Sequence, residues 1–372
     1  MFHVKPQSAF WSLFTVQFLG ALNDNLFKNL LVMWLTFEAT LPHKGVWVSA
    51  AAGIFILPFV VLSPLAGQLA DSLPKHRLIR WIKGGEVFIM ALGVVGFMLG
   101  SPWLLLMVLF LMGAQSALFG PVKYSILPDF FRDEDLVAVN SWWSGSTFVA
   151  ILLGTLAGTA GYAHWGVQPW LVGVVALSVV GWLAALWVPP VAAAARTLCL
   201  QWNPWRAVHT SLRFARSHHA WPIMLSISLF WMLGGIVLSQ IPLMADALGA
   251  PASAAWLLMT FAISLSAGAG LAYLLHREHI RLPWAWWAQA AAALALTGVW
   301  LVFPEHNTLW WALFALAALA GGLWIVPLYV WLQRYTDAAH RGQLFAALNV
   351  MNALFMVLGA GLAMGWHALH GS

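Results

Sequence analysis

The chain has 372 residues, of which 62% are hydrophobic and only 8% are charged, and its formal net charge is +5. Soluble domains carry about 25% charged residues, so this composition excludes a soluble fold and also a disordered chain. The single cysteine excludes a disulfide scaffold, and the basic residues lie in short loops, which argues against a nucleic-acid binder. Apolar runs of about 20 residues can cross a hydrocarbon core as helices, whereas porin-type strands would alternate over about 10 residues. The sequence therefore predicts an all-α polytopic membrane protein.

We expect eleven membrane spans, in chain order, from these runs. They cover residues 9–37, 46–69, 78–100, 102–124, 137–163, 168–190, 220–246, 251–276, 283–303, 307–332 and 342–367. The first run follows Lys5 and is too long for a signal peptide, and no small-residue cleavage site follows it. It is therefore expected to be a true span.

The positive charges predict the topology, because cytoplasmic loops are enriched in Lys and Arg. With a cytoplasmic N-terminus, 15 of the 17 Lys and Arg residues fall in or beside cytoplasmic segments. These are Lys5, Lys75, Arg77, Arg80, Lys83, Lys123, Arg132, Arg196, Arg206, Arg213, Arg216, Arg277, Arg281, Arg334 and Arg341. Lys44 lies outside, and Lys28 lies within a span.

Two helical bundles are expected from the distribution of polar residues along the chain. A basic stretch at 191–219 separates six spans from five, which predicts an N-terminal six-helix bundle at 1–190, a cytoplasmic linker, and a C-terminal bundle at 220–372. Two equal halves would need twelve spans, so we expect that the last helix is missing. Duplicated halves are frequent in transporters.

A weak internal repeat supports this division. A proline followed within three residues by a tyrosine near the end of spans four and ten, an asparagine early in spans five and eleven, and paired small residues recur in the same order. The matching elements are Pro121-Val122-Lys123-Tyr124 with Pro327-Leu328-Tyr329, Asn140 with Asn349, and Gly154-x-x-x-Gly158 with Gly361-x-x-x-Gly365. Small residues four apart let helix backbones approach closely.

A polar cluster interrupts the first span and is the main candidate site. Asn23, Asp24 and Asn25 are consecutive, and Lys28 follows four residues after Asp24, on the same helix face. Asp24 and Lys28 can therefore form an ion pair that holds the helix in its bundle. Alternatively, the cluster lines a central cavity. Three consecutive side chains point about 100° apart, so one helix contact cannot satisfy all of them, which favours the cavity.

For each of the other polar groups at membrane depth, the sequence allows two interpretations. Glu86 lies three residues after Lys83 and is interpreted as half of a local pair or as a group that couples substrate to an ion. Lys123 and Tyr124 end span four, where the lysine either snorkels to the interface or contacts an anionic headgroup. The 13 histidines show no metal-ligand spacing, and no catalytic motif appears. We therefore expect no catalytic residues, no metal and no cofactor.

The turn after span two resembles the signature loop of the major facilitator superfamily. It contains Gly67-Gln68-Leu69-Ala70-Asp71 followed by Lys75 and Arg77, although Ser72 and Pro74 depart from the usual Arg and Gly. The resemblance implies a major facilitator fold of two pseudo-symmetric bundles, in which the aspartate makes a gating contact with the facing bundle. Gly67, Asp71, Lys75 and Arg77 are the gating residues it implies, to which we add the repeat-related Asn140 and Asn349.

A narrower resemblance, to the lysophospholipid transporter branch, rests on residues 18–25, 119–128 and 150–154. It implies inward transport of lyso-phosphatidylethanolamine across the bacterial inner membrane by alternating access. Members act alone or fused to an acyltransferase and acyl-carrier-protein synthetase, which would here be a separate chain. Asp24 would face the ammonium of the headgroup, and Lys28 or Lys123 would face its phosphate. Asp24 or Glu86 is the carboxylate that would couple transport to sodium or protons.

Three alternatives stay open at this point. The first is a facilitator-type exporter of another amphipathic small molecule; a sugar carrier would line its cavity with more amides and acids than this chain has. The second is a membrane enzyme that acts on lipid. The third is an inactive truncated copy.

Overall fold

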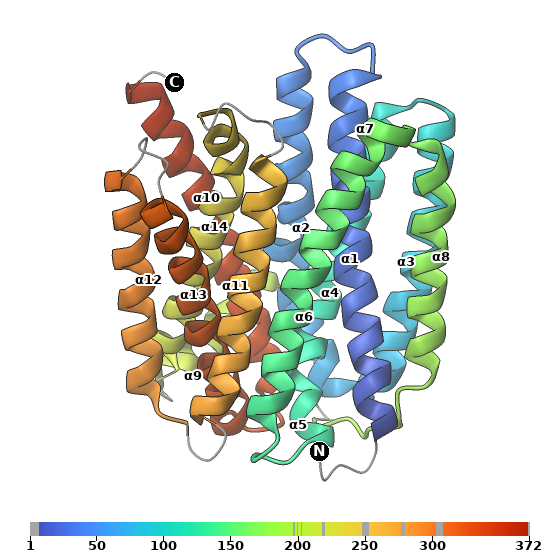
Figure 1. Ribbon diagram of the computed structural model, residues 1–372. Helices are drawn as coiled ribbons and strands as arrows, with labels where there is room; N and C mark the ends of the chain where they lie inside the picture. Colours follow the sequence, from blue (N-terminus) through green and yellow to red (C-terminus); the bar gives the residue numbers. More distant parts are fainter. Residues whose placement is uncertain are drawn as a thin grey trace. The chain divides into compact units, whose positions relative to one another are not determined.

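The computed structural model describes residues 7–195, 198, 200, 201, 203–217, 220–247, 253–276, 280–302 and 308–370. Within these ranges the regular structure is helical and no strand occurs (Figure 1). The long helices are α1 (Gln7–Phe37), α2 (Lys44–Ser72), α3 (Lys75–Met98), α4 (Pro102–Ser125), α6 (Leu136–Leu156), α8 (Gln168–Leu186), α10 (Trp221–Ala247), α11 (Ser253–His276), α12 (Leu282–Val302), α13 (Thr308–Tyr335) and α14 (Arg341–His370). The short ones are α5 (Leu127–Phe130), the π-helix η1 (Ala157–Gly161), α7 (Tyr162–Trp165) and α9 (Pro204–Ser217).

All the predicted spans are helices in the described part of the chain. Ten of these helices are long and apolar enough to cross a membrane. Helix α1 has 31 residues, which is long enough to cross a membrane. The polar residues around Asp24 lower its hydrophobicity. The run predicted as one span at 137–163 consists of α6, η1 and α7 in direct succession.

The linker predicted at 191–219 contains α9, a helix that we did not expect. The side-chain Oδ1 of Asn203 accepts hydrogen bonds from the backbone N–H groups of Trp205 (3.1 Å) and Arg206 (3.2 Å), so it caps the first turn. Pro204 stands at the first helical position, where its missing N–H costs nothing. These start signals are local and were readable from the sequence. Three residues of the predicted charge pattern, Lys5, Arg196 and Arg277, lie outside the described residues.

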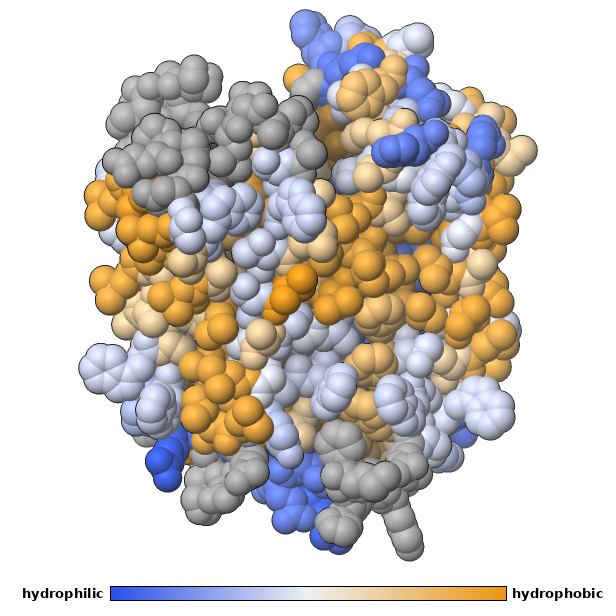
Figure 2. Space-filling view, in the orientation of Figure 1, coloured by the Kyte–Doolittle hydropathy of each residue, from blue (hydrophilic) through white to orange (hydrophobic). Residues whose placement is uncertain are grey.

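Large apolar side chains are exposed along the spans. On the face shown in Figure 2, hydrophobic residues cover much of the middle, whereas hydrophilic residues gather toward its ends. The exposed apolar residues include Phe88, Leu183, Leu294, Leu301 and Val357. A water-soluble protein does not expose apolar surface on this scale, so the chain is a multi-pass membrane protein.

The chain divides into two compact units, each discontinuous in sequence. The first comprises Met1–Phe130, Leu153–Trp221 and Thr336–Ala353. The second comprises Phe131–Leu152, Pro222–Tyr335 and Leu354–Ser372. Parts of α6 and α14 therefore belong to different units from the rest of those helices.

The first unit uses the predicted small-residue motif of span five to bring two helices together. A Cβ atom at Gly154 would collide with the backbone carbonyl oxygen of Leu22 in α1. A Cβ atom at Gly158 would lie 2.7 Å from Cβ of Asn29, also in α1. Close backbone approach is the expected effect of this spacing. The related motif in α14 does not act this way at Gly361, whose missing Cβ faces open space.

The second unit is held by a close contact between α11 and α13. A Cβ atom at Gly268 would collide with the carbonyl oxygen of Leu319, and one at Gly322 would collide with that of Leu265. Backbone atoms cannot yield as a flexible side chain can, so these glycines determine the distance between the two helices.

Replacing Gly268 tests this contact. We expect Gly268→Ala to lower stability by about 1–3 kcal/mol, because the added methyl forces the α11 and α13 backbones apart. Thermal unfolding of the purified protein in detergent measures the effect. Gly270→Ala is the matched control, since the same methyl two residues further along α11 meets nothing within 4 Å. Equal melting temperatures for the two variants would contradict the assignment.

Candidate functional site

The polar run of α1 divides between two faces of the helix. Asn23 is fully buried, and its Nδ2 donates to the backbone carbonyl of Val174 in α8 (3.1 Å). This side chain therefore ties α1 to α8 and does not line an open space. Asp24, Asn25 and Lys28 are only half-buried. At 1.5 Å per residue, Asp24 lies about 25 Å from the start of α1, near the middle of the helix.

Asp24 belongs to a polar cluster between α1, α3 and α4. Its Oδ2 accepts a hydrogen bond from the hydroxyl of Ser116 (2.6 Å), which also donates to Oε1 of Gln115 (3.2 Å). Gln115 in turn donates to Oε2 of Glu86 (2.9 Å), and Lys83 forms an ion pair with the same oxygen at 2.5 Å. We call these five residues the Asp24 cluster.

The local pair predicted between Lys83 and Glu86 is confirmed, and it is buried, with side-chain exposures of 1% and 4%. Gln115 and Ser116 were not among the predicted site residues. A signal for them existed, because they form an isolated polar pair within the otherwise apolar run 102–118. Gly20 makes room for this arrangement, since a Cβ atom there would collide with Nζ of Lys83.

The ion pair that the spacing of Asp24 and Lys28 allows, the less favoured of the two interpretations, is not among the ion pairs of the described residues. Nζ of Lys28 donates to Oδ1 of Asn25 (3.2 Å) and lies 5.5 Å from the ring centroid of Phe55 in α2. Asp24 points instead to α4, where Ser116 offers a short hydrogen bond. Spacing along α1 allowed the pair, but a neighbouring helix supplied the better partner.

Lys123 adds a further positive charge near the cluster. Its Nζ lies 5.0 Å from the ring centroid of Tyr124, and it interacts electrostatically with Asp24 and Lys83. Tyr124 stacks on Phe345 of α14 with ring centroids 5.4 Å apart. Among the described residues, the ammonium groups that interact with Asp24 or Glu86 are those of Lys28, Lys83 and Lys123, so positive charge is in excess there. Such a site can accept an anionic group next to a cationic one.

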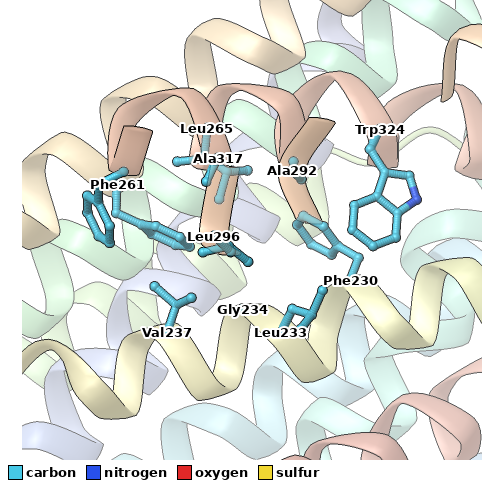
Figure 3. A pocket seen from close by; sticks show the side chains of 13 residues that line it. Phe230, Leu233, Gly234, Val237, Phe261, Leu265, Ala292, Leu296, Ala317 and Trp324 are labelled. Atoms are coloured by element: carbon cyan, nitrogen blue, oxygen red, sulfur yellow. The ribbon is translucent and has the colours of Figure 1, made fainter. Parts of the chain in front are cut away.

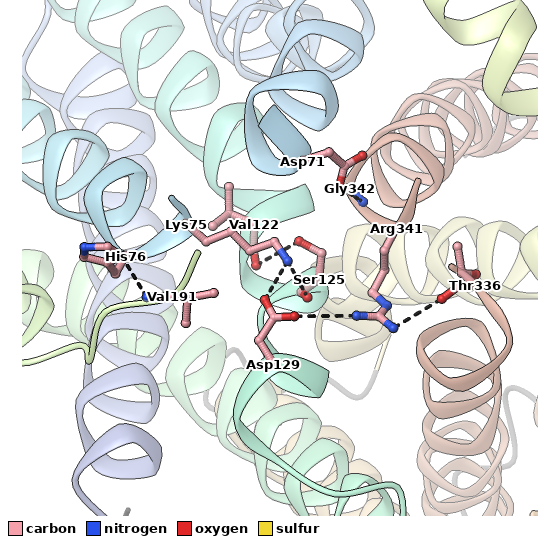
Figure 4. Close-up of polar contacts among 10 residues, drawn as sticks. All are labelled: Asp71, Lys75, His76, Val122, Ser125, Asp129, Val191, Thr336, Arg341 and Gly342. Carbon is pink, nitrogen blue, oxygen red and sulfur yellow. Dashed lines mark hydrogen bonds and ion pairs between the residues drawn. The ribbon is translucent and has the colours of Figure 1, made fainter. Parts of the chain in front are cut away.

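Asp71 makes a second polar site, at the end of α2 (Figure 4). Its Oδ1 accepts the backbone N–H of Gly342 (2.7 Å), and its Oδ2 accepts the backbone N–H (3.0 Å) and the side-chain amide (3.3 Å) of Gln343. Both N–H groups belong to the first turn of α14 and lack partners within that helix. The carboxylate therefore caps a helix 271 residues away in the chain and also complements its dipole.

Glycines bring the two helices close enough for this contact. A Cβ atom at Gly67 would lie 2.5 Å from Cβ of Ala346 and 2.7 Å from the carbonyl oxygen of Gly342. A Cβ atom at Gly342 would lie 2.6 Å from Oδ1 of Asp71. Gly67 is therefore required at this position of the predicted signature loop.

An ion network lies beside this cap. Nζ of Lys75 is 2.6 Å from Oδ2 of Asp129 in α5, and it also donates to the carbonyl of Ser125 (3.1 Å). The other carboxylate oxygen of Asp129 is 3.7 Å from Arg341 at the start of α14. Asp129 was not predicted, because α5 is too short to show a periodic pattern. Arg77, by contrast, is exposed and forms no ion pair among the described residues.

Asn140 and Asn349, predicted as gating residues, lie in different surroundings. Asn140 and Gln333 are buried and exchange two amide hydrogen bonds, of 2.6 and 3.2 Å, in the second unit. Asn349 lies in the first unit against Gly120, and its buried Nδ2 has no hydrogen-bond partner in the described part of the chain. Their participation in gating stays a prediction.

The sequence is similar to a family of membrane transporters and to individual members of it. A sequence profile of the Major Facilitator Superfamily matches residues 8–360. The Lysophospholipid transporter LplT of Cronobacter sakazakii is 28% identical over 358 residues, which are 93% of this chain and 85% of that protein. The LplT of Salmonella paratyphi B is 31% identical over 200 residues, 51% of this chain and 46% of that protein. The chain thus matches less than half the length of the Salmonella relative.

Solved structures share the fold. The major facilitator transporter FucP, crystallised in the outward conformation, superposes with a TM-score of 0.77 at 14% sequence identity, covering 98% of this chain and 92% of FucP. At this identity the likeness concerns the fold alone.

Proposed function

The chain belongs to the major facilitator superfamily, a family of transporters, and we propose that it moves a lysophospholipid across a membrane by alternating access. The observation that carries this proposal is the Asp24 cluster, in which the half-buried Asp24, near the middle of α1, joins the buried ion pair of Lys83 and Glu86 through Ser116 and Gln115. Charges at that depth are costly, so a functional site is their default interpretation. The names of the LplT relatives support a lipid as the substrate.

The chemistry of the cluster fits a zwitterionic headgroup of the lyso-phosphatidylethanolamine type. Asp24 is the anionic group that would receive the ethanolamine ammonium. Lys28 and Lys123 are the cations that would receive the phosphate, through charge-assisted hydrogen bonds. Asn25 orients Lys28 by accepting its hydrogen bond.

Alternating access requires a contact that breaks and forms again during the cycle. We assign this role to the cap that Asp71 places on α14. The cap joins the two halves of the sequence through hydrogen bonds, which can exchange with water at small net cost. Gly67 and Lys75 support it as described above.

The direction and the partners of transport complete the proposal. The basic residues favour a cytoplasmic N-terminus in a bacterial inner membrane. Sodium or a proton is proposed as the coupling ion, with Asp24 or Glu86 as the coupling carboxylate. An acyltransferase/acyl-carrier-protein synthetase on a separate chain would consume the imported lysolipid.

Reconstitution into proteoliposomes tests the function directly. We expect inward movement of labelled lyso-phosphatidylethanolamine, and we expect Asp24→Asn to slow it about tenfold or more, because a charged hydrogen bond contributes about 1.5–3 kcal/mol. Asn29→Ala is the control: this half-buried residue follows one turn after Asn25, and its side-chain amide hydrogen-bonds, within the described part of the chain, to the backbone of Asn25 and the hydroxyl of Thr155. A normal rate for Asp24→Asn would refute the headgroup assignment. Competition by another amphipathic solute but not by lysolipid would favour the exporter alternative.

A further inference from the structure

Two cavities of the second unit differ in their chemistry. One, of about 40 Å³ between α10, α11, α12 and α13, is lined among the described residues by uncharged, mostly apolar side chains (Figure 3). The other is larger, about 410 Å³, and is formed by residues 280–284 together with Trp331 and Tyr335. Arg281 is the one charged residue among the described residues that line it. A pocket of this size can hold a small ligand or the headgroup of a lipid.

We propose that this larger cavity, the Arg281 pocket, binds the phosphate of an anionic phospholipid of the surrounding bilayer. The lipid is a resident ligand on the surface of the second unit and is distinct from the transported substrate. The inference therefore goes beyond the proposed function and does not depend on what the chain transports. It requires only that the chain spans a membrane, as its apolar helices show.

The backbone of Arg281 is held in place on both sides. Its N–H group donates to Nδ1 of the buried His276 at the end of α11 (3.2 Å). Its carbonyl oxygen accepts the N–H group of Trp284 in the first turn of α12 (3.0 Å). The guanidinium is exposed and makes no hydrogen bond or ion pair within the described part of the chain. A planar fork of N–H donors matches the oxygens of a phosphate, so this side chain is available to such a ligand.

The other polar side chains of the wall also favour an anion. They are the indole N–H groups of Trp284 and Trp331 and the hydroxyl of Tyr335. Indole nitrogens only donate hydrogen bonds, and a hydroxyl can donate one. No carboxylate occurs among the described residues that line the pocket. An ammonium group would therefore lack an anionic partner in this wall, whereas a phosphate would meet a cation and several donors. This chemistry selects an anionic headgroup over a zwitterionic one.

An exposed apolar stripe of α12 indicates that the phosphate belongs to a lipid. Trp287, Leu294 and Leu301 are spaced seven residues apart, which places them on one face of the helix, and they are 68–73% exposed. Trp284 lies three residues before Trp287 on the same face and also lines the pocket. A soluble phosphate would use only the arginine and its neighbouring donors. A phospholipid bound there could also lay an acyl chain along the stripe.

The aromatic residues and the charges agree with a site at the membrane surface. The rings of Trp331 and Tyr335 stack with centroids 4.9 Å apart, and Trp and Tyr are enriched where a membrane meets water. Arg334 precedes Tyr335, and its guanidinium donates to the backbone carbonyl of Asp133. In the proposed topology this end of the unit faces the cytoplasm. Basic pockets between spans on that side are suited to anionic headgroups.

Native mass spectrometry of the full chain in detergent, titrated with phosphatidylglycerol, measures the affinity of the tightest bound lipid. Arg281→Gln should weaken it about tenfold, the effect of losing a charged hydrogen bond to phosphate. Arg132→Gln is the matched control, because Arg132 is an exposed arginine of the same unit that pairs with Glu134 and does not line the pocket. This control should bind as the wild type does. Equal affinities of the two variants would overturn the proposal.

Photolabelling locates the bound lipid. A phosphatidylglycerol with a diazirine in its headgroup, photolysed in nanodiscs that contain the full chain, should label residues 280–284 and 331–335. Trp284→Leu should weaken binding about threefold, because it removes an aromatic contact of the lipid. Trp256→Leu, at an exposed tryptophan of α11 outside the pocket, should leave it unchanged. Label confined to other segments would contradict the assignment.

Other ligands separate the possible sources of the phosphate. Inorganic phosphate in excess should leave phosphatidylglycerol bound; displacement would mean that the pocket takes a soluble anion. Phosphatidylethanolamine carries the same phosphate with an added ammonium and should bind about tenfold more weakly. Equal affinity would mean that any bilayer lipid occupies the pocket. If the wild type binds phosphatidylglycerol here but moves no lysolipid, the proposed function fails and the site stands. If it moves lysolipid while Arg281→Gln binds phosphatidylglycerol normally, only the site fails.

Discussion

Replacing Asp71 by alanine is expected to release the start of α14 and to stop most transport. The substitution removes the acceptor of two backbone N–H groups and one side-chain amide. Hydrogen bonds to a charged group contribute about 1.5–3 kcal/mol each, so we expect the amides of Gly342 and Gln343 to exchange with deuterium at least about tenfold faster. Hydrogen-exchange mass spectrometry of the α13–α14 turn measures this, and the proteoliposome assay measures the loss of transport.

Asp337 supplies the control for this experiment. It is an exposed carboxylate in the turn before α14, paired with His340 at 3.1 Å, and this hydrogen bond holds the pKa of Asp337 below its usual value. Asp337→Ala removes the same charge near the same helix end but leaves the cap intact. We expect wild-type exchange at Gly342 and wild-type transport. Equal effects of the two substitutions would mean that net charge, not capping, is what matters at Asp71.

Breaking the buried pair of Lys83 and Glu86 is expected to be the most destabilising single change in the first unit. Glu86→Leu leaves the ammonium of Lys83, which is 1% exposed, without its partner at 2.5 Å. Removing one member of a buried ion pair costs about 3–5 kcal/mol, because the remaining charge is not solvated. We expect a large fall in melting temperature and in the yield of folded protein from membranes.

The double variant Lys83→Leu with Glu86→Leu shows whether that loss comes from the unpaired charge. Replacing both members of such a pair by apolar residues is often neutral, so the melting temperature should recover most of the way. Glu86→Gln keeps a hydrogen-bonding group near Gln115 and should lie between the two. If the double variant is as unstable as Glu86→Leu, the pair is not what stabilises this region. If the double variant also transports normally, Glu86 is not the coupling carboxylate.

Spacing rules predicted contacts within one helix with mixed success. The pair of Lys83 and Glu86 was found from residues three apart, and the hydrogen bond that Gln115 donates to the same carboxylate oxygen leaves the pair intact. The same reasoning failed for Asp24 and Lys28. There, Ser116 of α4 and Asn25 of α1 offer hydrogen bonds that satisfy each charge separately. A rule about one helix surface cannot include a donor on another helix.

The sequence by itself determined the membrane class, the helical spans and the position of the charged run in α1. It could do so because a backbone in hydrocarbon must satisfy its own hydrogen bonds, which makes long apolar runs helical wherever they occur. Only the tertiary structure decided which helix contacts which. It shows that Asp71 caps α14 and that Gln115 and Ser116 join Asp24 to Glu86. It also shows that four helices of the second unit leave an apolar space between them. Periodicity shows which face of a helix is polar, but the partner of that face depends on packing between segments far apart in the chain.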